Sequence, residues 1–521
     1  MLINIYGAKC IGIDAVPVTV EVDITRGLGI RLVGLADIAV KESLLRTITA
    51  LQSIGFKIPG KKIVINLAPA DMHKSGSGYD LPIALGIIAA SGQCVLPDTD
   101  KYIIMGELGL DASLRPVSGA LPMAELARRM GLKGCILPEA SAYEAYDYFE
   151  TDIYAARNLN EVIEILSGED RGRYSVRNCL CDSRATGLSE PNGGGMSDEY
   201  MDFSEIIGQD RAKRALEIAA SGNHNVIMIG APGSGKSSLA KALAGILPEM
   251  SREESIVTSK IFSIAGKARE GVGLMKKRPF RAPHYSASLA AIIGGGNGEN
   301  ILPGEISLAQ NGILFCDEFA QMPKSVTEAL RGPLEDRKVV VSRLRAKVEF
   351  PSSFMLVAAT NPCPCGYYGE GDRCTCTVGQ RTSYLSRLSG PIMDRIDLQL
   401  WLHPVDPKKL VGSHTAESSA EVALRVKRAR EMQATRFRDE NIFTNSEMTS
   451  RMMRKYCPLS EDCKRLMEKI MTNMGLSARA FSRVIKLART IADLAGEDNI
   501  LPQHLTEAAG YRFLDKSEGI S

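Results

Sequence analysis

The run HNVIMIGAPGSGKSSLAKALAGIL constrains the fold of this chain more than any other stretch of its sequence. The apolar residues 226–229 predict a buried strand, and the run from Gly230 to Ser237 matches the pattern GxxxxGK[ST] and leads into a helical pattern. Backbone N–H groups of such a loop, and of the helix that follows it, bind phosphate oxygens. The strand–loop–helix context argues against a chance glycine-rich turn. The sequence therefore predicts a phosphate-binding loop at the end of a strand.

The residues of this loop differ in what they can contribute. The Lys236 ammonium can reach the β- and γ-phosphates of a nucleotide, and the Ser237 hydroxyl can bind Mg²⁺. We therefore expect ATP and Mg²⁺ as cofactors. The expected nucleotide-binding residues are Gly230, Ala231, Pro232, Gly233, Ser234, Gly235, Lys236, Ser237 and Ser238.

Two further strand-like runs end in polar residues that suit the same chemistry. ILFC is followed by Asp317 and Glu318, which we interpret as a carboxylate that holds Mg²⁺ and a carboxylate that polarises the attacking water. FMLVAAT is followed by Asn361, at the position where ATPases of the AAA+ class place a residue that senses the γ-phosphate; a helix-capping asparagine is the alternative. Arg395 and Arg479 complete the catalytic candidates, because arginine stabilises charge on a transferring phosphoryl group, although spacing alone does not separate them from ordinary surface arginines.

The rest of the chain divides by composition and periodicity. Residues 1–168 alternate strand-like and helical runs and predict an α/β or α+β domain. Residues 169–202 are rich in Ser, Gly and Asn and predict a flexible linker. Residues 203–404 return to an α/β pattern, and 405–521 predict a charged helical domain. The formal net charge is only +2, so any contact with nucleic acid must come from local basic clusters.

We expect a cytoplasmic protein that does not bind a membrane. The run MLINIYGAKCIGIDAV lacks the basic segment and apolar region of a secretory signal. The longest apolar run, LPIALGIIAA, is too short to span a bilayer. The chain has 12 cysteines, and in this context they indicate reduced thiols or metal ligands rather than disulfides.

Four of these cysteines lie in the run NPCPCGYYGEGDRCTC, directly after the strand that ends before Asn361. Two C-x-C pairs, Cys363 with Cys365 and Cys374 with Cys376, could bind a structural Zn²⁺ as four thiolates. The alternative is a flexible loop with four free or disulfide-prone thiols. The metal site would anchor the sensor strand where neighbouring subunits pack.

A basic hairpin is expected between the strand that precedes Asp317 and the strand that precedes Asn361. EDRKVVVSRLRAKVEF predicts two short strands around a turn near Leu344, and Arg343, Arg345 and Lys347 lie at its tip. In AAA+ DNA motors a hairpin at this place in the chain points into a central pore. Contacts of such cations with DNA phosphates would be independent of sequence and sensitive to salt. The alternative is a solvated hairpin that the charges keep soluble.

Together, the runs GAPGSGKS, RPFRAPHYSAS, PGEISLAQNGILFCDE, AATNPCPCGYYG, GPIMDRIDL and LSARAFSRVIKLARTIADL resemble the YifB/ComM family of magnesium-chelatase-like AAA+ ATPases over almost the full chain. The resemblance implies an α/β P-loop AAA+ core, an N-terminal Lon-protease-like α+β domain and a C-terminal helical lid domain. It implies a hexameric ring with ATP bound between subunits, Arg395 as the finger reaching the neighbouring site and Arg479 as the second sensor. It also implies forked or branched DNA as a partner, with branch migration in recombination or natural transformation.

The resemblance to the Lon proteolytic domain does not extend to its Ser–Lys dyad. The matching positions hold Gly78 in place of the serine nucleophile and Leu121 in place of the lysine base. Ser75 and Ser77 lie close by, so a shifted dyad is the remaining route to a protease. We expect a catalytically inactive domain.

Three function classes remain, and a protease is the weakest of them. The other two are a DNA translocase or branch-migration helicase and a chelatase- or chaperone-type ATPase that remodels a protein partner. Pores that thread protein chains usually present an aromatic residue, and the sequence has none between Val339 and Val348. This difference favours the DNA motor.

Overall fold

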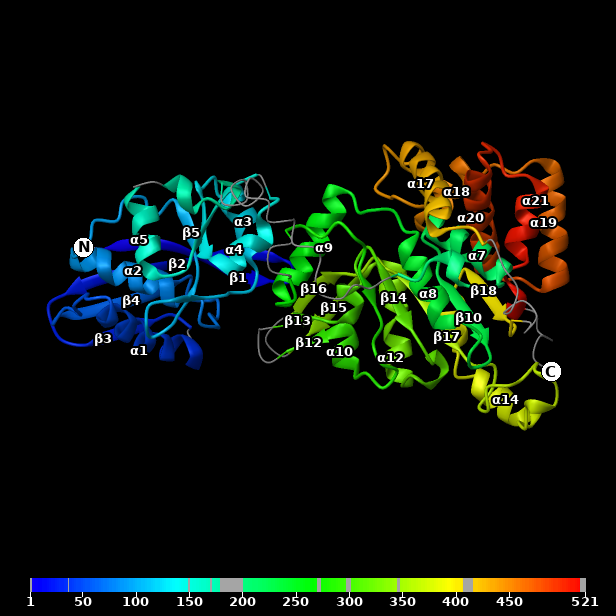
Figure 1. Ribbon diagram of the computed structural model, residues 1–521, viewed down its shortest axis with the longest axis horizontal. Helices are drawn as coiled ribbons and strands as arrows, with labels where there is room; N and C mark the ends of the chain where they lie inside the picture. Colours follow the sequence, from blue (N-terminus) through cyan, green and yellow to red (C-terminus); the bar gives the residue numbers. More distant parts are fainter. Residues whose placement is uncertain are drawn as a thin grey trace.

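The computed structural model describes residues 2–35, 37–148, 150–168, 171–178, 200–268, 273–296, 301–343, 347–405 and 416–515. Along its longest axis the molecule shows a first sheet with its helices, a second sheet, and a group of helices from the C-terminal part of the chain (Figure 1). Most of the predicted linker, 179–199, lies outside the described residues, and so does Arg345.

The N-terminal part is built on a seven-stranded mixed sheet in the order β3-β4-β2-β1-β5-β8-β9. β1, β2 and β4 pair antiparallel, whereas β5, β8 and β9 continue the sheet in parallel from β1. The strands are β1 (Ile3–Ile11), β2 (Asp14–Thr25), β3 (Ile30–Val33), β4 (Lys62–Ala68), β5 (Tyr102–Ile104), β8 (Gly134–Pro138) and β9 (Asp152–Ala156). The main helices are α1 (Ile38–Ser53), α2 (Asp80–Ser91), α3 (Ala120–Arg129) and α5 (Leu159–Ser167), with a short α4 (Glu139–Ala142) and a ribbon of β6 (Glu107–Leu108) and β7 (Leu114–Arg115).

The apolar run that is too short for a membrane forms the buried helix α2. Such a helix is apolar all round, and it packs against β1 and β2 in the core. A Cβ built on Gly86 would lie 2.4 Å from Cγ2 of Val22, so only glycine permits this close approach.

The second sheet is parallel throughout, in the order β11-β14-β17-β10-β18. β17 lies between the strand of the phosphate loop, β10, and the strand before Asp317, β14. Both faces are covered, because alternate residues of β10, β14 and β17 belong to two different buried cores. The strands are β10 (Val226–Gly230), β11 (Phe280–Arg281), β14 (Ile313–Cys316), β17 (Met355–Thr360) and β18 (Leu398–Leu402).

Helices surround this sheet, and the C-terminal helices share the core on one of its faces. α7 packs against α17 and α20, so the helical part of the chain is joined to the sheet rather than separate from it. The helices before β18 are α7 (Asp210–Gly222), α8 (Lys236–Gly245), α9 (Arg252–Ile264), α10 (Leu289–Ile293), α11 (Glu305–Leu308), α12 (Lys324–Ala329), α13 (Arg331–Asp336), α14 (Val378–Leu385) and α15 (Gly390–Met393). Those after it are α17 (Ser419–Arg436), α18 (Ser450–Tyr456), α19 (Glu461–Met474), α20 (Ala478–Ala495) and α21 (Pro502–Ala509).

The two sheets meet through the β1–β2 turn and α3. The ammonium of Lys260, on α9, bonds the carboxylates of Asp14 and Glu125 at 2.6 Å each and is almost fully buried. In the same turn, a Cβ on Gly12 would lie 3.3 Å from Cγ1 of Val348, on the hairpin of β15 (Lys338–Ser342) and β16 (Lys347–Pro351). The N-terminal sheet therefore contacts both α9 and the basic hairpin.

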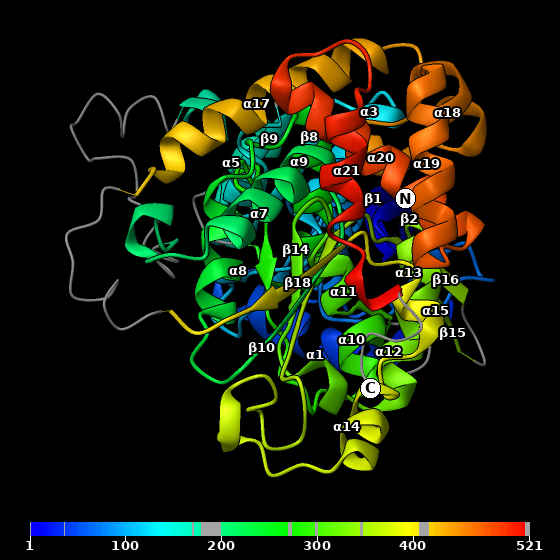
Figure 2. The ribbon, with the colours of Figure 1, turned by 90° about the vertical axis from the view of Figure 1, so that its right-hand side faces the viewer.

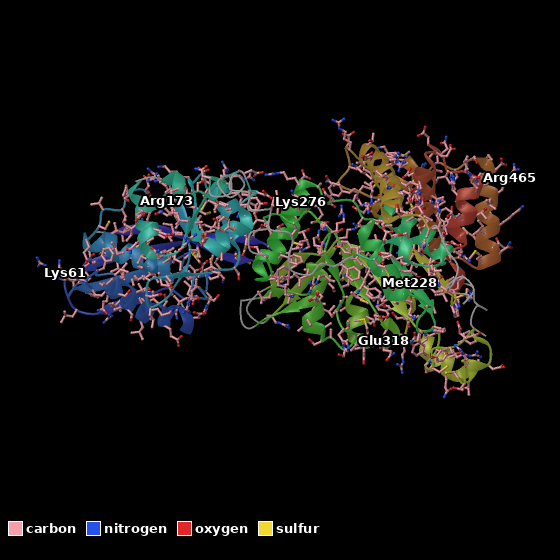
Figure 3. All side chains as sticks on the ribbon, viewed as in Figure 1. Lys61, Arg173, Met228, Lys276, Glu318 and Arg465 are labelled. Atoms are coloured by element: carbon pink, nitrogen blue, oxygen red, sulfur yellow. The ribbon has the colours of Figure 1, made fainter. Side chains whose placement is uncertain are left out.

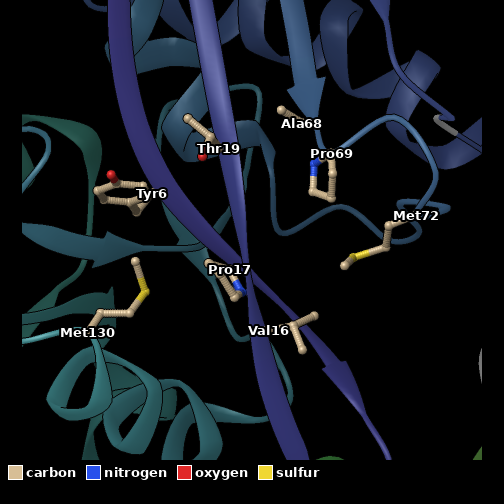
Figure 4. A pocket seen from close by; sticks show the side chains of 8 residues that line it. All are labelled: Tyr6, Val16, Pro17, Thr19, Ala68, Pro69, Met72 and Met130. Carbon is tan, nitrogen blue, oxygen red and sulfur yellow. The ribbon is translucent and has the colours of Figure 1, made fainter.

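A shallow groove of about 430 Å³ lies on the N-terminal sheet (Figure 4). Strands β1 and β2 cross it, with Met130 on one side and Met72 on the other. The hydroxyls of Tyr6 and Thr19 are the polar groups among its lining side chains, so the groove presents no acid–base pair. It is lined by Tyr6, Val16, Pro17, Thr19, Ala68, Pro69, Met72 and Met130.

Candidate nucleotide-binding site

The candidate site lies where three strands of the parallel sheet end. The phosphate loop follows β10, Asp317 and Glu318 follow β14, and Asn361 follows β17. Because these strands are parallel and adjacent, their carboxyl ends meet at one edge of the sheet, which is where ligands bind in open α/β sheets. In Figure 3, Met228 of β10 lies within this part of the molecule and Glu318 lies at its lower margin.

The phosphate loop has the backbone that its glycines allow. Gly233 and Gly235 adopt φ values of 80° and 87°, in the left-handed region that residues with a Cβ rarely occupy. Helix α8 begins at Lys236, so its first N–H groups face the loop, and Pro232 and Gly233 are exposed. This arrangement provides backbone donors and a helix N-terminus for phosphate oxygens.

Lys236 lies at the centre of the site. Its Nζ donates to the carbonyl oxygens of Gly230 at 2.7 Å and Ala231 at 3.0 Å, and to Oδ1 of Asn361 at 3.3 Å. Burial lowers the pKa of Lys236, while the carboxylates of Asp317 and Glu318 act in the opposite direction. The phosphate loop and the predicted sensor thus share one ammonium group.

Ser237 and Asp317 are also brought together. The Ser237 hydroxyl donates to Oδ2 of Asp317 at 3.2 Å, although the two residues come from α8 and from the end of β14. A hydroxyl and a carboxylate oxygen are hard ligands of the kind that Mg²⁺ prefers beside phosphates. These two residues fit the ion.

Glu318 has an unusual backbone conformation. Its φ of 49° and ψ of 39° lie in the left-handed region, and its N–H donates to Oδ1 of Asp317 at 2.8 Å. Such backbone outliers concentrate at functional sites. The two adjacent carboxylates therefore have different surroundings. Asp317 accepts a hydrogen bond from Ser237, and Glu318 is half-buried beside it.

The two predicted arginines both bond one short segment, residues 391–394. Arg395 follows α15, is 12% exposed, donates to the Pro391 carbonyl at 2.7 Å and pairs with Glu335. Arg479, in the first turn of α20, is 67% exposed and pairs with Asp394 at 3.3 Å. Among the described residues, neither arginine bonds a group of the phosphate loop.

A network around the buried Asp397, close in sequence to Arg395, was not predicted. Arg483 bonds both the carboxylate of Asp397 and the carbonyl of Asp394, and His224 lies 3.5 Å from the Asp397 carboxylate. Burial alone would raise the pKa of Asp397, but Arg483 and His224 outweigh it and hold that pKa far below its usual range. The network ties α20 to the segment that carries Arg395. Arg483 lies four residues, about one helical turn, after Arg479. This spacing was the only sign in the sequence that Arg483 belongs to the same region.

Gln209 is a second residue that the sequence did not reveal. It adopts φ 59° at the start of α7, and its Nε2 donates to the carbonyls of His403 at 2.7 Å and Ser234 at 3.3 Å. It therefore joins the phosphate loop to the end of β18. A Gly-Gln pair before a helix is too common a turn signal to single it out.

The basic hairpin forms as predicted in secondary structure, with Ser342 paired to Lys347. Val339, Val341, Val348 and Phe350 are buried on one face, and the other face is exposed. A Cβ on Gly295 would lie 3.1 Å from the Arg343 guanidinium, so a second ribbon, β12 (Gly294–Gly295) with β13 (Leu302–Pro303), lies beside the tip.

The four cysteines of the two C-x-C pairs gather in one cluster. Their sulfur atoms all lie within 4.8 Å of one another. Cys363 Sγ lies 3.3 Å from Cys365 Sγ and 3.8 Å from Cys374 Sγ, and Cys365 Sγ lies 3.7 Å from Cys374 Sγ. In Figures 1 and 2 the segment that contains α14, directly after the cluster, projects from the edge of the sheet where β10 and β17 end.

The Lon-like positions before α2 and on α3 hold no Ser–Lys dyad. A Cβ on Gly78 would lie 2.9 Å from Cε of Met105, and Leu121 is buried. The Ser77 hydroxyl bonds Glu107 rather than a lysine. The Lys74 ammonium is buried and bonds the carbonyl of Pro69.

The strand order, the phosphate loop and the polar residues at three adjacent strand ends define a P-loop protein of the AAA+ class. Three family models match consecutive segments: "Subunit ChlI of Mg-chelatase" residues 20–141, "Magnesium chelatase, subunit ChlI" residues 202–410, and "Magnesium chelatase, subunit ChlI C-terminal" residues 416–512. The mixed α/β fold with a helical C-terminal part is therefore confirmed.

Relatives that align with nearly the whole chain identify the family within the AAA+ class. The chain is 40% identical over 515 residues to the uncharacterized protein YifB of Salmonella typhimurium, covering 98% of this chain and 97% of that protein. It is 40% identical over 512 residues to the competence protein ComM of Haemophilus influenzae, with the same coverage. An 88-residue stretch is 40% identical to the archaeal Lon protease of Archaeoglobus fulgidus. The chain belongs to the YifB/ComM family of magnesium-chelatase-like AAA+ proteins. In the part of the chain that the structure describes, none of the helices could cross a membrane.

Proposed function

We propose that this protein is an ATPase whose subunits form a hexameric ring and drive branch migration of DNA. The observation that carries the ATPase proposal is the convergence of Lys236, Asn361, Ser237 and Asp317 through two hydrogen bonds that join three strand ends. Each pair joins residues far apart in the sequence, as expected for a site rather than for local packing.

The proposed mechanism assigns one task to each group. Lys236 and the loop N–H groups bind the phosphates, and Asn361 holds Lys236 from the side of β17. Glu318 orients and polarises the attacking water. Ser237 and Asp317 would hold Mg²⁺, which would supply positive charge beside the phosphates. A Zn²⁺ ion at the cysteine cluster would be structural, because four thiolates leave no open coordination position.

The ring proposal rests on the arginines. Arg395 bonds Pro391 and Glu335 and does not bond the phosphate loop of its own subunit. We therefore propose that Arg395 acts on the nucleotide site of a neighbouring subunit. Its Nε is buried and has no hydrogen-bond partner among the residues that the structure describes, which leaves a donor for phosphate once the Glu335 pair opens. Arg479 pairs with Asp394, next to Arg395, and we propose that it responds to nucleotide as the second sensor.

DNA is the proposed partner because of the hairpin and the relatives. Ser342 and Lys347 form the last pair of the hairpin, and the sequence around its turn carries Arg343 and Arg345 as well. Six copies of these cations would line a pore. One full-length relative, ComM of Haemophilus influenzae, is named a competence protein, and we propose a role in competence for this chain as well. The N-terminal domain, which lacks a dyad at Gly78 and Leu121, would be an inactive scaffold that braces the hairpin through the β1–β2 turn.

Reversing the charge at the hairpin tip, Arg343→Glu with Arg345→Glu, should weaken DNA binding by at least about tenfold at every sequence tested and abolish the stimulation of ATP hydrolysis by DNA. The salt dependence of binding should also become shallower. Lys338→Ala is the matched control, because Lys338 lies at the base of the same hairpin and pairs with Glu349 at 3.2 Å. Unchanged DNA affinity in the double variant would favour a protein-remodelling ATPase instead.

A further inference from the structure

The loop that carries the cysteine cluster follows Asn361 in the chain, and it also contacts the nucleotide site. Cys363 to Gly366 form a turn closed by a hydrogen bond from the Gly366 N–H to the Cys363 carbonyl at 3.0 Å. Gly366 has φ 88°, and a Cβ built on it would lie 2.9 Å from Cδ of Pro232 in the phosphate loop and 3.8 Å from Cγ of Asn361. The turn that presents two cysteines therefore rests against both the phosphate loop and the sensor.

The other side of the loop rests on Trp401, the single tryptophan of the chain. The Tyr368 ring packs edge-on against Trp401, with centroids 6.2 Å apart, and the Arg381 guanidinium lies 4.2 Å from the centre of the same tyrosine ring. Trp401 belongs to β18, which pairs with β10 directly before the phosphate loop. The loop thus flanks the end of β10 on two sides.

The geometry of the cluster suits one metal ion. Four sulfurs around a Zn²⁺ ion with Zn–S bonds of ~2.3 Å stand about 3.8 Å apart. The separations among Cys363, Cys365 and Cys374, at 3.3, 3.7 and 3.8 Å, are close to this value and well beyond the ~2.05 Å of a disulfide. With Cys376 included, all four sulfurs lie within 4.8 Å of one another. Cys363 is fully buried, whereas the residues between the two pairs are polar or glycine and form no core of their own. A small segment without a core needs another source of order.

We propose that Cys363, Cys365, Cys374 and Cys376 bind a structural Zn²⁺ ion, and that the zinc-bound loop holds the phosphate loop in its nucleotide-binding position through the contact of Gly366 with Pro232. This inference rests on the proposed ATPase function. Zinc binding orders the turn, the ordered turn limits the positions open to Pro232, and nucleotide affinity therefore depends on zinc. The loss of zinc loosens one wall of the site while the residues that bind phosphate stay unchanged.

The test measures three quantities on the full-length protein purified without chelator: zinc by elemental analysis, affinity for a fluorescent ATP analogue, and Trp401 emission. We expect about one zinc per chain in the parent protein. Cys374→Ser with Cys376→Ser should lose the zinc, shift Trp401 emission and bind the analogue at least about tenfold more weakly. Cys94→Ser, at a cysteine of the N-terminal part, should match the parent in all three.

A pair of glycine variants tests the contact of Gly366 with Pro232 independently of zinc binding. Gly366→Ala should keep its zinc yet lose nucleotide affinity, because its Cβ would collide with Pro232. Gly371→Ala is the matched control in the same loop, since Gly371 also has a positive φ, 61°, but its Cβ would meet no atom within 4 Å. This pair also tests the proposal should the cysteine variant fail to fold.

Three outcomes would overturn the proposal in different ways. A metal-free parent protein would remove the zinc site. Equal nucleotide affinity in the parent, the zinc-free variant and Gly366→Ala would remove the coupling and leave the ATPase proposal standing. A zinc-loaded parent that binds no nucleotide would contradict both the coupling and the ATPase function.

Discussion

Replacing Glu318 with glutamine is expected to slow ATP hydrolysis by at least about 10³-fold while ATP remains bound. The amide keeps the size of the side chain but removes the carboxylate that polarises water, and Lys236, Ser237 and Asp317 keep their contacts. A loss of this size corresponds to about 4 kcal/mol of transition-state stabilisation. Phosphate release under single-turnover conditions, together with the affinity for a fluorescent ATP analogue, measures the two effects separately.

Glu328→Gln provides the control for this experiment. It makes the same chemical change on α12, where the carboxylate pairs with Arg331 at 2.8 Å, and should leave hydrolysis near that of the parent protein. Hydrolysis by Glu318→Gln at a rate near that of the control would contradict the assignment of Glu318 as the group that polarises water.

Arg395→Ala should lower turnover by roughly 10³- to 10⁵-fold, the range seen when an arginine finger is absent. If Arg395 acts on the neighbouring site, mixing this variant with Lys236→Ala subunits should restore part of the activity. The Lys236→Ala subunits bind phosphate poorly but still carry Arg395, so they complete the intact sites of the other subunits. Arg331→Ala, at a surface arginine that pairs with Glu328, is the control and should retain its activity.

Native mass spectrometry of the same mixtures shows whether rings with both kinds of subunit form. Mixed rings without any recovery of hydrolysis would contradict the role of Arg395 toward a neighbour. A recovery that follows the fraction of mixed rings would support it.

The strands of the nucleotide site were predictable because they are short, continuous apolar runs that end in chemically distinctive residues. GAPGSGKS after β10, Asp317-Glu318 after β14 and Asn361 after β17 each mark where a buried strand emerges from the sheet. Parallel strands place such ends on one edge, so the contacts of Lys236 with Asn361 and of Ser237 with Asp317 follow from topology. The two C-x-C pairs were also recognisable from their spacing, and the structure brings their four sulfur atoms within 4.8 Å of one another.

The rest of the site depends on contacts between segments far apart in the sequence. Gln209 reaches the phosphate loop through a left-handed backbone at one position, and Arg483 reaches Asp397 across a helix-to-strand interface. Periodicity reports which face of an element is apolar and not which partner it meets. For the same reason, the sequence did not show that Gly366 rests on Pro232, or that the C-terminal helices share a core with the sheet.

The measurement that tests the central proposal most directly is ATP-dependent movement of a synthetic Holliday junction, followed as conversion to its branch-migration products. We expect the parent protein to convert the junction only with hydrolysable ATP and Mg²⁺, and Glu318→Gln to bind the junction without moving it. ATP hydrolysis that DNA does not stimulate, with the junction left unmoved by the parent protein, would contradict the proposal.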